Sequence, residues 1–135
     1  MSKTIQQKMH AQHRQWQSDS DSWRSDIDEW KKELRTALGD LREVEDMLRD
    51  SLDALAVHAD GVWENEQRRC AHELELREEA KTGAKKKTDK AWAKLHRKHA
   101  ARHERMADAH NRMKKYQHKV VAGVMRLLRA ARKGM

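Results

Sequence analysis

The 135-residue chain contains no proline and no phenylalanine, only five glycines and a single cysteine. Without proline, and with so few glycines, it lacks the residues that form the frequent tight turns of a β-sheet protein. One cysteine cannot form an intrachain disulfide, and such a chain is compatible with a reducing compartment. These absences exclude an intrachain disulfide framework and favour an all-α protein.

Long apolar runs are also missing. No stretch approaches the roughly 20 apolar residues that a membrane span requires, and the first ten residues, MSKTIQQKMH, contain no apolar signal core. Hydrophobic residues make up 37% of the chain and charged residues 39%, a balance typical of helices that each bury a single stripe. We therefore expect a soluble, cytoplasmic protein built from long helices, and we do not expect a membrane to be its partner.

Acidic residues are scarce after residue 80. Residues 1–80 carry 19 acidic against 12 basic side chains, whereas residues 81–135 carry 3 against 18, within an overall charge of +8. An acidic arm that pairs with a basic arm is partly neutralised, which favours antiparallel pairing of the two parts. The remaining positive excess would attract polyanions.

The chain does contain a heptad pattern that is symmetric about Gly83 and Ala84. On both sides of this point, seam residues alternate in steps of 3 and 4, as in an antiparallel two-helix coiled coil. The fold is therefore predicted to be a long antiparallel, coiled-coil-like helical hairpin. The seam pairs that this register predicts are Leu41–Leu127, Val44–Val124, Leu48–Val120, Leu55–Met113, His58–His110, Val62–Met106, Asn65–His103, Arg69–His99, His72–His96 and Leu76–Trp92.

Helix boundaries follow from local signals. Gly39 suits a helix C-terminus, and Asp40 with Glu43 resembles a capping box. We predict helices over residues 3–38 and 40–81, a turn near 82–85, and a third helix over 85–132. A start a few residues later, with Thr88 or Asp89 as the N-cap, is the alternative, because the lysines at 85–87 repel one another. The chain is thus predicted to contain an N-terminal tryptophan-bearing helix (1–39) and a hairpin (40–135).

Three tryptophans occupy successive heptad positions near the N-terminus, ahead of any partner in the hairpin. Burying each such side chain is worth about 1.5–3 kcal/mol. Either the N-terminal helix turns back at Gly39 to complete a three-helix bundle, or it continues from the second helix and pairs with another chain. A second apolar stripe on the hairpin, which includes Trp63 and Leu128, would also be exposed unless a further helix packs against it. We favour a homodimer in which helices of two chains complete a bundle. The tryptophan stripe consists of Trp16, Trp23, Ile27, Trp30 and Leu34.

Nine histidines are many for this length, and several share one face of the third helix. His99 and His103 have the i, i+4 spacing with which two imidazoles chelate one metal ion. In a dimer, four imidazoles in one layer would suit zinc or haem. Polar seam layers that fix the register are the favoured interpretation, because Arg69 would repel a cation there. The candidate metal ligands are His72, His96, His99 and His103.

Basic side chains gather after the turn and form a candidate polyanion-binding surface. Contacts of lysine and arginine with phosphates carry no sequence information, and no helix-turn-helix, zinc-finger or RNA-binding motif accompanies them. Nucleic-acid binding is therefore an alternative to the interpretation as a solvated helix face. The candidate residues are Lys85, Lys86, Lys87, Lys90, Lys94, Arg97, Lys98, Arg102 and Arg105.

Catalytic residues are not recognisable. The chain has no glycine-rich phosphate loop or nucleophile elbow, and Cys70 and His72 point to different helical faces. We predict a non-enzymatic structural or interaction module that self-associates or binds a partner helix through the tryptophan stripe. Nucleic-acid binding through the basic C-terminal helix is the first alternative, and a His-rich helical bundle that binds a metal or haem is the second.

Overall fold

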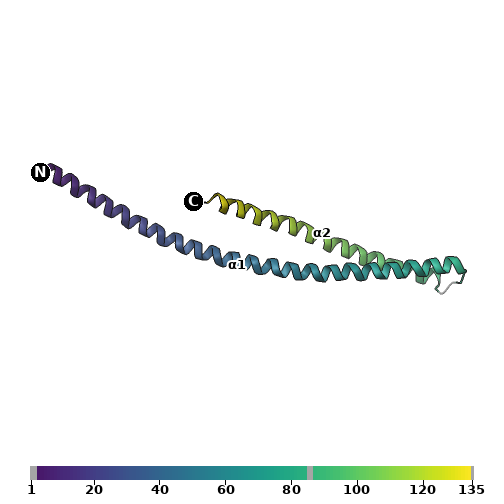
Figure 1. The fold of residues 1–135 in the computed structure, drawn as a ribbon. Helices are drawn as coiled ribbons and strands as arrows, with labels where there is room; N and C mark the ends of the chain where they lie inside the picture. Colours follow the sequence, from purple (N-terminus) through teal and green to yellow (C-terminus); the bar gives the residue numbers. More distant parts are fainter. Residues whose placement is uncertain (1–2, 85–86, 135) are drawn as a thin grey trace. The chain divides into compact units, whose positions relative to one another are not determined.

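The computed structural model describes residues 3–84 and 87–134. These residues form two long helices, α1 (Lys3–Thr82) and α2 (Asp89–Lys133), shown in Figure 1. No strand is found within the described ranges. The structure thus agrees with the predicted all-α class. The chain separates into an N-terminal unit, Met1–Leu52, and a C-terminal unit, Asp53–Met135.

The predicted helix boundary at Gly39 is wrong. Helix α1 continues through both the serine-rich segment at 18–22 and Gly39, and among the described glycines only Gly83 has a φ in the left-handed region. An interior glycine costs a helix about 1 kcal/mol, which the hydrogen bonds of an uninterrupted helix on both sides outweigh. The described residues therefore form two helices rather than three, and α1 has no turn at Gly39 that would let it fold back. The division into parts at 39/40 stays a prediction.

Three local features form the turn: a left-handed glycine, a backbone hydrogen bond at the end of α1 and an N-cap at the start of α2. Helix α1 ends at Thr82, and Gly83 follows with φ 71°, a left-handed conformation that favours glycine. The Gly83 amide donates to the Glu79 carbonyl at 2.9 Å, which satisfies one of the last carbonyls of the helix. On the far side, Thr88 Oγ1 accepts a hydrogen bond from the Ala91 amide at 3.1 Å. Helix α2 thus begins at Asp89 rather than at 85, which agrees with the alternative of a later start capped by Thr88.

Substituting two glycines should have opposite effects on stability. Gly83→Ala places a Cβ on a left-handed residue and should lower the free energy of unfolding by about 1 kcal/mol. Gly39→Ala, whose Cβ would meet nothing within 4 Å, should raise it by up to about 1 kcal/mol because alanine is the better helix former. Urea unfolding followed by circular dichroism measures both variants. Effects of the same sign would contradict this description of the turn.

Within the C-terminal unit, the last part of α1 and the first part of α2 lie side by side and run antiparallel (Figure 1). Three contacts fix their register. Each joins two residues that the heptad symmetry pairs, and the predicted pairs that begin before residue 53 stay predictions. The three contacting pairs are His58–His110, Asn65–His103 and His72–His96.

The half-buried face of α2 differs from the predicted seam at every second position. Trp92, His99 and Met106 are half-buried, as the predicted seam requires. Between them, Leu95 and Arg102 are half-buried in place of their neighbours at 96 and 103. Leu95 and Arg102 are thus more covered than His96 and His103, although these two histidines still contact His72 and Asn65 on the other helix. Among the described residues, no apolar side chain is fully buried.

Candidate functional site

The tryptophan stripe lies on the part of α1 that belongs to the N-terminal unit. Trp16, Trp23 and Trp30 are 58%, 62% and 57% exposed, and Ile27 and Leu34 are exposed as well. Heptad spacing on one helix places all five side chains along a single face. Contiguous apolar surface of this kind marks interaction sites. The structure therefore brings together all five residues that the sequence predicts for the stripe.

The seam of the C-terminal unit contains two polar layers a heptad apart. His58 Nε2 and His110 Nδ1 lie 3.0 Å apart, with the two rings stacked at 5.3 Å between centroids. Asn65 Nδ2 lies 3.4 Å from His103 Nδ1. A histidine pair holds one hydrogen bond only if one facing nitrogen carries the proton and the other accepts it. Each layer therefore requires a particular tautomer and contributes to a defined register.

A third layer, around His72, combines three imidazoles and an indole. The His72 ring lies 4.8 Å from that of His99, 5.1 Å from that of Trp92 and 6.3 Å from that of His96, measured between centroids. Its Nδ1 atom is buried without a hydrogen-bond partner among the described residues. Burial, then the nearby His72 and Arg102, lower the pKa of His99 below the ordinary value. The layer therefore favours a neutral His99.

Three of the four predicted metal ligands share this layer, whereas His103 belongs to the Asn65 layer. In the described part of the chain, no group of three or more His, Cys, Asp or Glu side chains is arranged to hold a metal ion. The predicted site assembles its four imidazoles from two chains, so binding of zinc or haem stays a prediction.

The free energy of unfolding should fall as the pH drops below about 6.5. In the folded state the pKa of His99 is lowered by burial and by the nearby His72 and Arg102, while in the unfolded chain His99 takes up a proton near its ordinary value of 6.5. Because the unfolded state then binds more protons, stability is fully present above this pH and is lost progressively below it. Urea unfolding at pH 7.5, 6.5 and 5.5 measures the change. His99→Gln should flatten the dependence of the free energy of unfolding on pH, whereas the matched change His118→Gln, at an exposed position, should not. An equal dependence on pH in both variants would contradict the attribution of the effect to His99.

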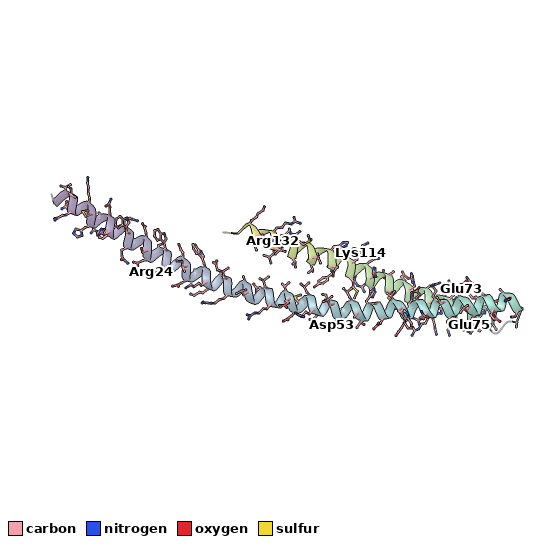
Figure 2. All side chains as sticks on the ribbon, in the orientation of Figure 1. Arg24, Asp53, Glu73, Glu75, Lys114 and Arg132 are labelled. Atoms are coloured by element: carbon pink, nitrogen blue, oxygen red, sulfur yellow. The ribbon has the colours of Figure 1, made fainter. Side chains whose placement is uncertain are left out.

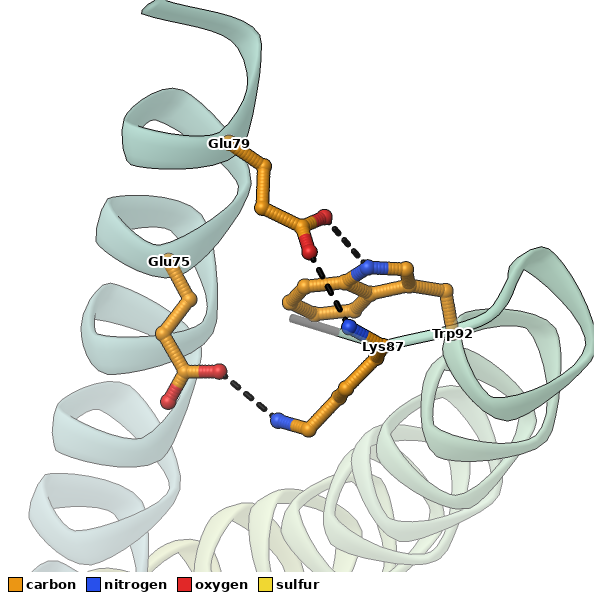
Figure 3. A network of polar contacts seen from close by, with 4 residues as sticks. All are labelled: Glu75, Glu79, Lys87 and Trp92. Atoms are coloured by element: carbon orange, nitrogen blue, oxygen red, sulfur yellow. Dashed lines mark hydrogen bonds and ion pairs between the residues drawn. The ribbon is translucent and has the colours of Figure 1, made fainter. Parts of the chain in front are cut away.

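Next to the turn, four side chains form a polar network (Figure 3). The Trp92 indole donates a hydrogen bond to Glu79. Lys87 Nζ lies 2.8 Å from Glu75 Oε2 and 4.8 Å from the centre of the Trp92 ring, a cation–π contact. The Lys87 amide donates to Glu79 Oε1 at 3.2 Å. The network joins the end of α1, the turn and the beginning of α2.

Sequence reasoning missed this network. The predicted register places Leu76 opposite Trp92, whereas the contacts of Trp92 involve His72 and Glu79, which lie four residues before and three residues after Leu76. The opposite charges of Glu75 and Lys87 on the two sides of the turn were a readable signal. A cavity of about 370 Å³ adjoins the network and is lined by Leu74, Glu75, Glu78, Glu79, Thr82, Ala84 and Trp92.

The candidate polyanion-binding residues differ in availability. Lys87 is engaged by Glu75 and Trp92, Arg102 is half-buried, and Lys85 and Lys86 lie outside the described residues. Further along α2, Lys114 and Arg132 extend from the helix (Figure 2). A basic surface therefore remains on α2. Its exposed candidates are Lys90, Lys94, Arg97, Lys98 and Arg105.

Comparisons with known proteins found no matching protein family, curated protein or solved structure. Within the described ranges, neither helix has an apolar stretch long enough to cross a membrane.

Proposed function

We propose that the protein is a non-enzymatic structural or interaction module that self-associates through the tryptophan stripe. In this proposal, α1 and α2 form an antiparallel hairpin over residues 40–132, and a second chain completes a helical bundle with it. The observation that carries the proposal is the row of exposed tryptophans at heptad spacing on α1. Such a row is the pattern with which one helix recognises another.

The energetics of the single chain support association. No apolar side chain of the described residues is fully buried, although long helices gain most of their stability from packing an apolar face. Burial of each exposed tryptophan against a partner would contribute about 1.5–3 kcal/mol before the cost of association. The second apolar stripe, which includes the exposed Trp63 and Leu128, offers further surface for a bundle.

Removal of the stripe tests the proposal. Light scattering of the full chain should give a mass above that of one chain, and deletion of residues 1–35 should reduce it to the mass of one shortened chain. If the shortened chain keeps the same number of copies, the stripe is not the interface. If the full chain is itself a monomer at micromolar concentration, self-association is wrong.

Binding of a nucleic acid or another polyanion is a second candidate function. The exposed lysines and arginines of α2 favour it, as does the excess of 18 basic over 3 acidic residues after residue 80. A helix face of this charge neutralises phosphates and releases their counterions, without reading the base sequence.

Affinity for duplex DNA should then depend steeply on salt. Three or more phosphate contacts predict at least about a tenfold loss of affinity between 50 and 200 mM salt. Fluorescence anisotropy with labelled duplexes of two unrelated sequences measures the loss, which should be equal for both. No detectable binding at 50 mM salt would exclude this candidate.

A further inference from the structure

We propose that the partner at the tryptophan stripe is a second copy of this chain, aligned parallel and in register with the first. This inference rests on the proposed self-association and adds its geometry. The charges that border the stripe supply the argument, because in a two-helix coiled coil the flanking charges determine which orientation is favourable.

The heptad positions follow from the stripe itself. Steps of 3 and 4 assign the tryptophans to position d of the heptad and place position a four residues after each d. Positions e and g border this a/d seam on its two sides. Position d holds Met9, Trp16, Trp23 and Trp30, and position a holds His13, Ser20, Ile27 and Leu34.

The two borders of the seam carry opposite charges. Position g holds the acidic Asp19, Asp26 and Glu33, whereas position e holds the basic Arg24 and Lys31. All of these side chains are exposed except Asp19, which is half-exposed. The stripe is therefore acidic along one edge and basic along the other.

A parallel pair brings opposite charges together. In that arrangement, a residue at g faces the residue at e five positions later in the partner chain. Asp19 then faces Arg24 of the second copy, and Asp26 faces Lys31. The two-fold symmetry repeats both pairs, so each copy supplies two acids and two bases.

An antiparallel pair brings like charges together. In that arrangement, g faces g and e faces e, whatever the longitudinal register. Acidic Asp19, Asp26 and Glu33 would face one another, and Arg24 would face Arg24 or Lys31. Repulsion between like charges disfavours this alignment, so the charge pattern selects the parallel one.

The contacts inside one chain leave Arg24 available for such a pair. Its Nη1 atom lies 3.8 Å from Asp21 Oδ1, and the two side chains are 75% and 62% exposed. Arg24 extends from α1 in Figure 2. A long, exposed ion pair of this kind holds an arginine only weakly, so Asp19 of a second copy can compete for it.

The sizes of the seam residues suit the same alignment. Parallel register stacks each tryptophan against its counterpart in a d layer, where aromatic rings pair favourably. The small Ser20 lies at the a position between Trp16 and Trp23 and leaves room for their indoles.

Cysteine cross-linking in the full chain tests the orientation. Ser20→Cys in a Cys70→Ser background should form a disulfide dimer under mild oxidation with oxidised glutathione, because position 20 meets itself across a parallel seam. The matched variant, Ala37→Cys in the same background, should do likewise, because Ala37 occupies the next position d, seven residues after Trp30. In a mixture of both variants refolded together, mass spectrometry should find no disulfide between positions 20 and 37, since 17 helical residues separate them by about 25 Å. In an antiparallel pair of any register, a position a faces a position d, so neither position 20 nor position 37 would meet its own copy. Failure of either single variant to form a disulfide dimer, or formation of the mixed disulfide, would overturn the inference.

Charge reversal provides a second test that involves no cysteine. Asp19→Lys with Asp26→Lys should weaken self-association at least about tenfold, because the new lysines then face Arg24 and Lys31 of the second copy and repel them. Adding Arg24→Glu and Lys31→Glu should restore it. Unchanged or tighter association of the first variant would overturn the parallel alignment while leaving self-association intact. A wild-type chain that stays monomeric would overturn the proposed function as well.

Discussion

Changing Trp16, Trp23 and Trp30 together to glutamine should abolish the proposed self-association and leave a monomer. Each tryptophan exposes more than half of its surface in the single chain, so the surface lost from the interface is large. At about 1.5–3 kcal/mol for each buried tryptophan, the dissociation constant should rise more than about 100-fold. Sedimentation velocity at one fixed micromolar concentration measures the change in mass.

A matched control keeps the number of substitutions and the new residue constant. Ser18→Gln, Ser25→Gln and Lys32→Gln lie on the face of the helix opposite the stripe and should leave the mass unchanged. Circular dichroism should show the same helicity in both triple variants, since glutamine is a good helix former. Continued association of the variant that lacks Trp16, Trp23 and Trp30 would show that another surface holds the copies together.

Trp92→Ala should produce the largest single-site loss of stability in the C-terminal unit. Trp92 is half-buried, lies 5.1 Å from the His72 ring, donates to Glu79 and carries Lys87 over its face. Loss of these contacts should lower the free energy of unfolding by about 2–3 kcal/mol, less than for a fully buried tryptophan. Trp92→Phe keeps an aromatic ring at this position but loses the hydrogen bond to Glu79 and should cost about 1 kcal/mol.

The control is Trp63→Ala, because Trp63 is 61% exposed in the same unit and should cost less than about 0.5 kcal/mol. Urea unfolding of all three variants should be measured in the chain that also carries Trp16→Gln, Trp23→Gln and Trp30→Gln, so that association does not contribute to the measured stability. Equal losses for Trp92→Ala and Trp63→Ala would show that the network near the turn does not stabilise the helix pair.

Heptad periodicity predicted which side chains meet within the C-terminal unit. A period of 3 and 4 on two arms of opposite direction leaves little freedom in the register, and the contacts of His58, Asn65 and His72 are those of the predicted pairs. The turn followed from the glycine at position 83, whose left-handed backbone stops the helix.

Local signals failed where they competed with a long helix. Gly39 and Asp40 form a plausible end and cap, yet a preference of about 1 kcal/mol does not interrupt α1. The half-burial of Leu95 in place of His96 also escaped the periodicity, because adjacent residues at 95 and 96 fit a heptad almost equally well. The Trp92 network depends on the path of the turn, which no heptad describes.

The tryptophan stripe could be read directly from the sequence, since its spacing alone places it on one face. The partner of the stripe and its orientation could not be read from the sequence, because the hydrophobic effect is non-directional and many different apolar surfaces can pack against the same stripe. Direction enters only through the charges at Asp19, Arg24, Asp26 and Lys31, and these become interpretable once α1 is known to be uninterrupted through this region.

The mass of the unmodified full chain tests self-association most directly. Sedimentation equilibrium from about 1 to 100 μM, at 150 mM salt and pH 7.5, reports it without substitutions. We predict twice the chain mass of 15.9 kDa over most of this range, with dissociation toward the single chain at the lowest concentrations. A mass of 15.9 kDa at every concentration would contradict the account.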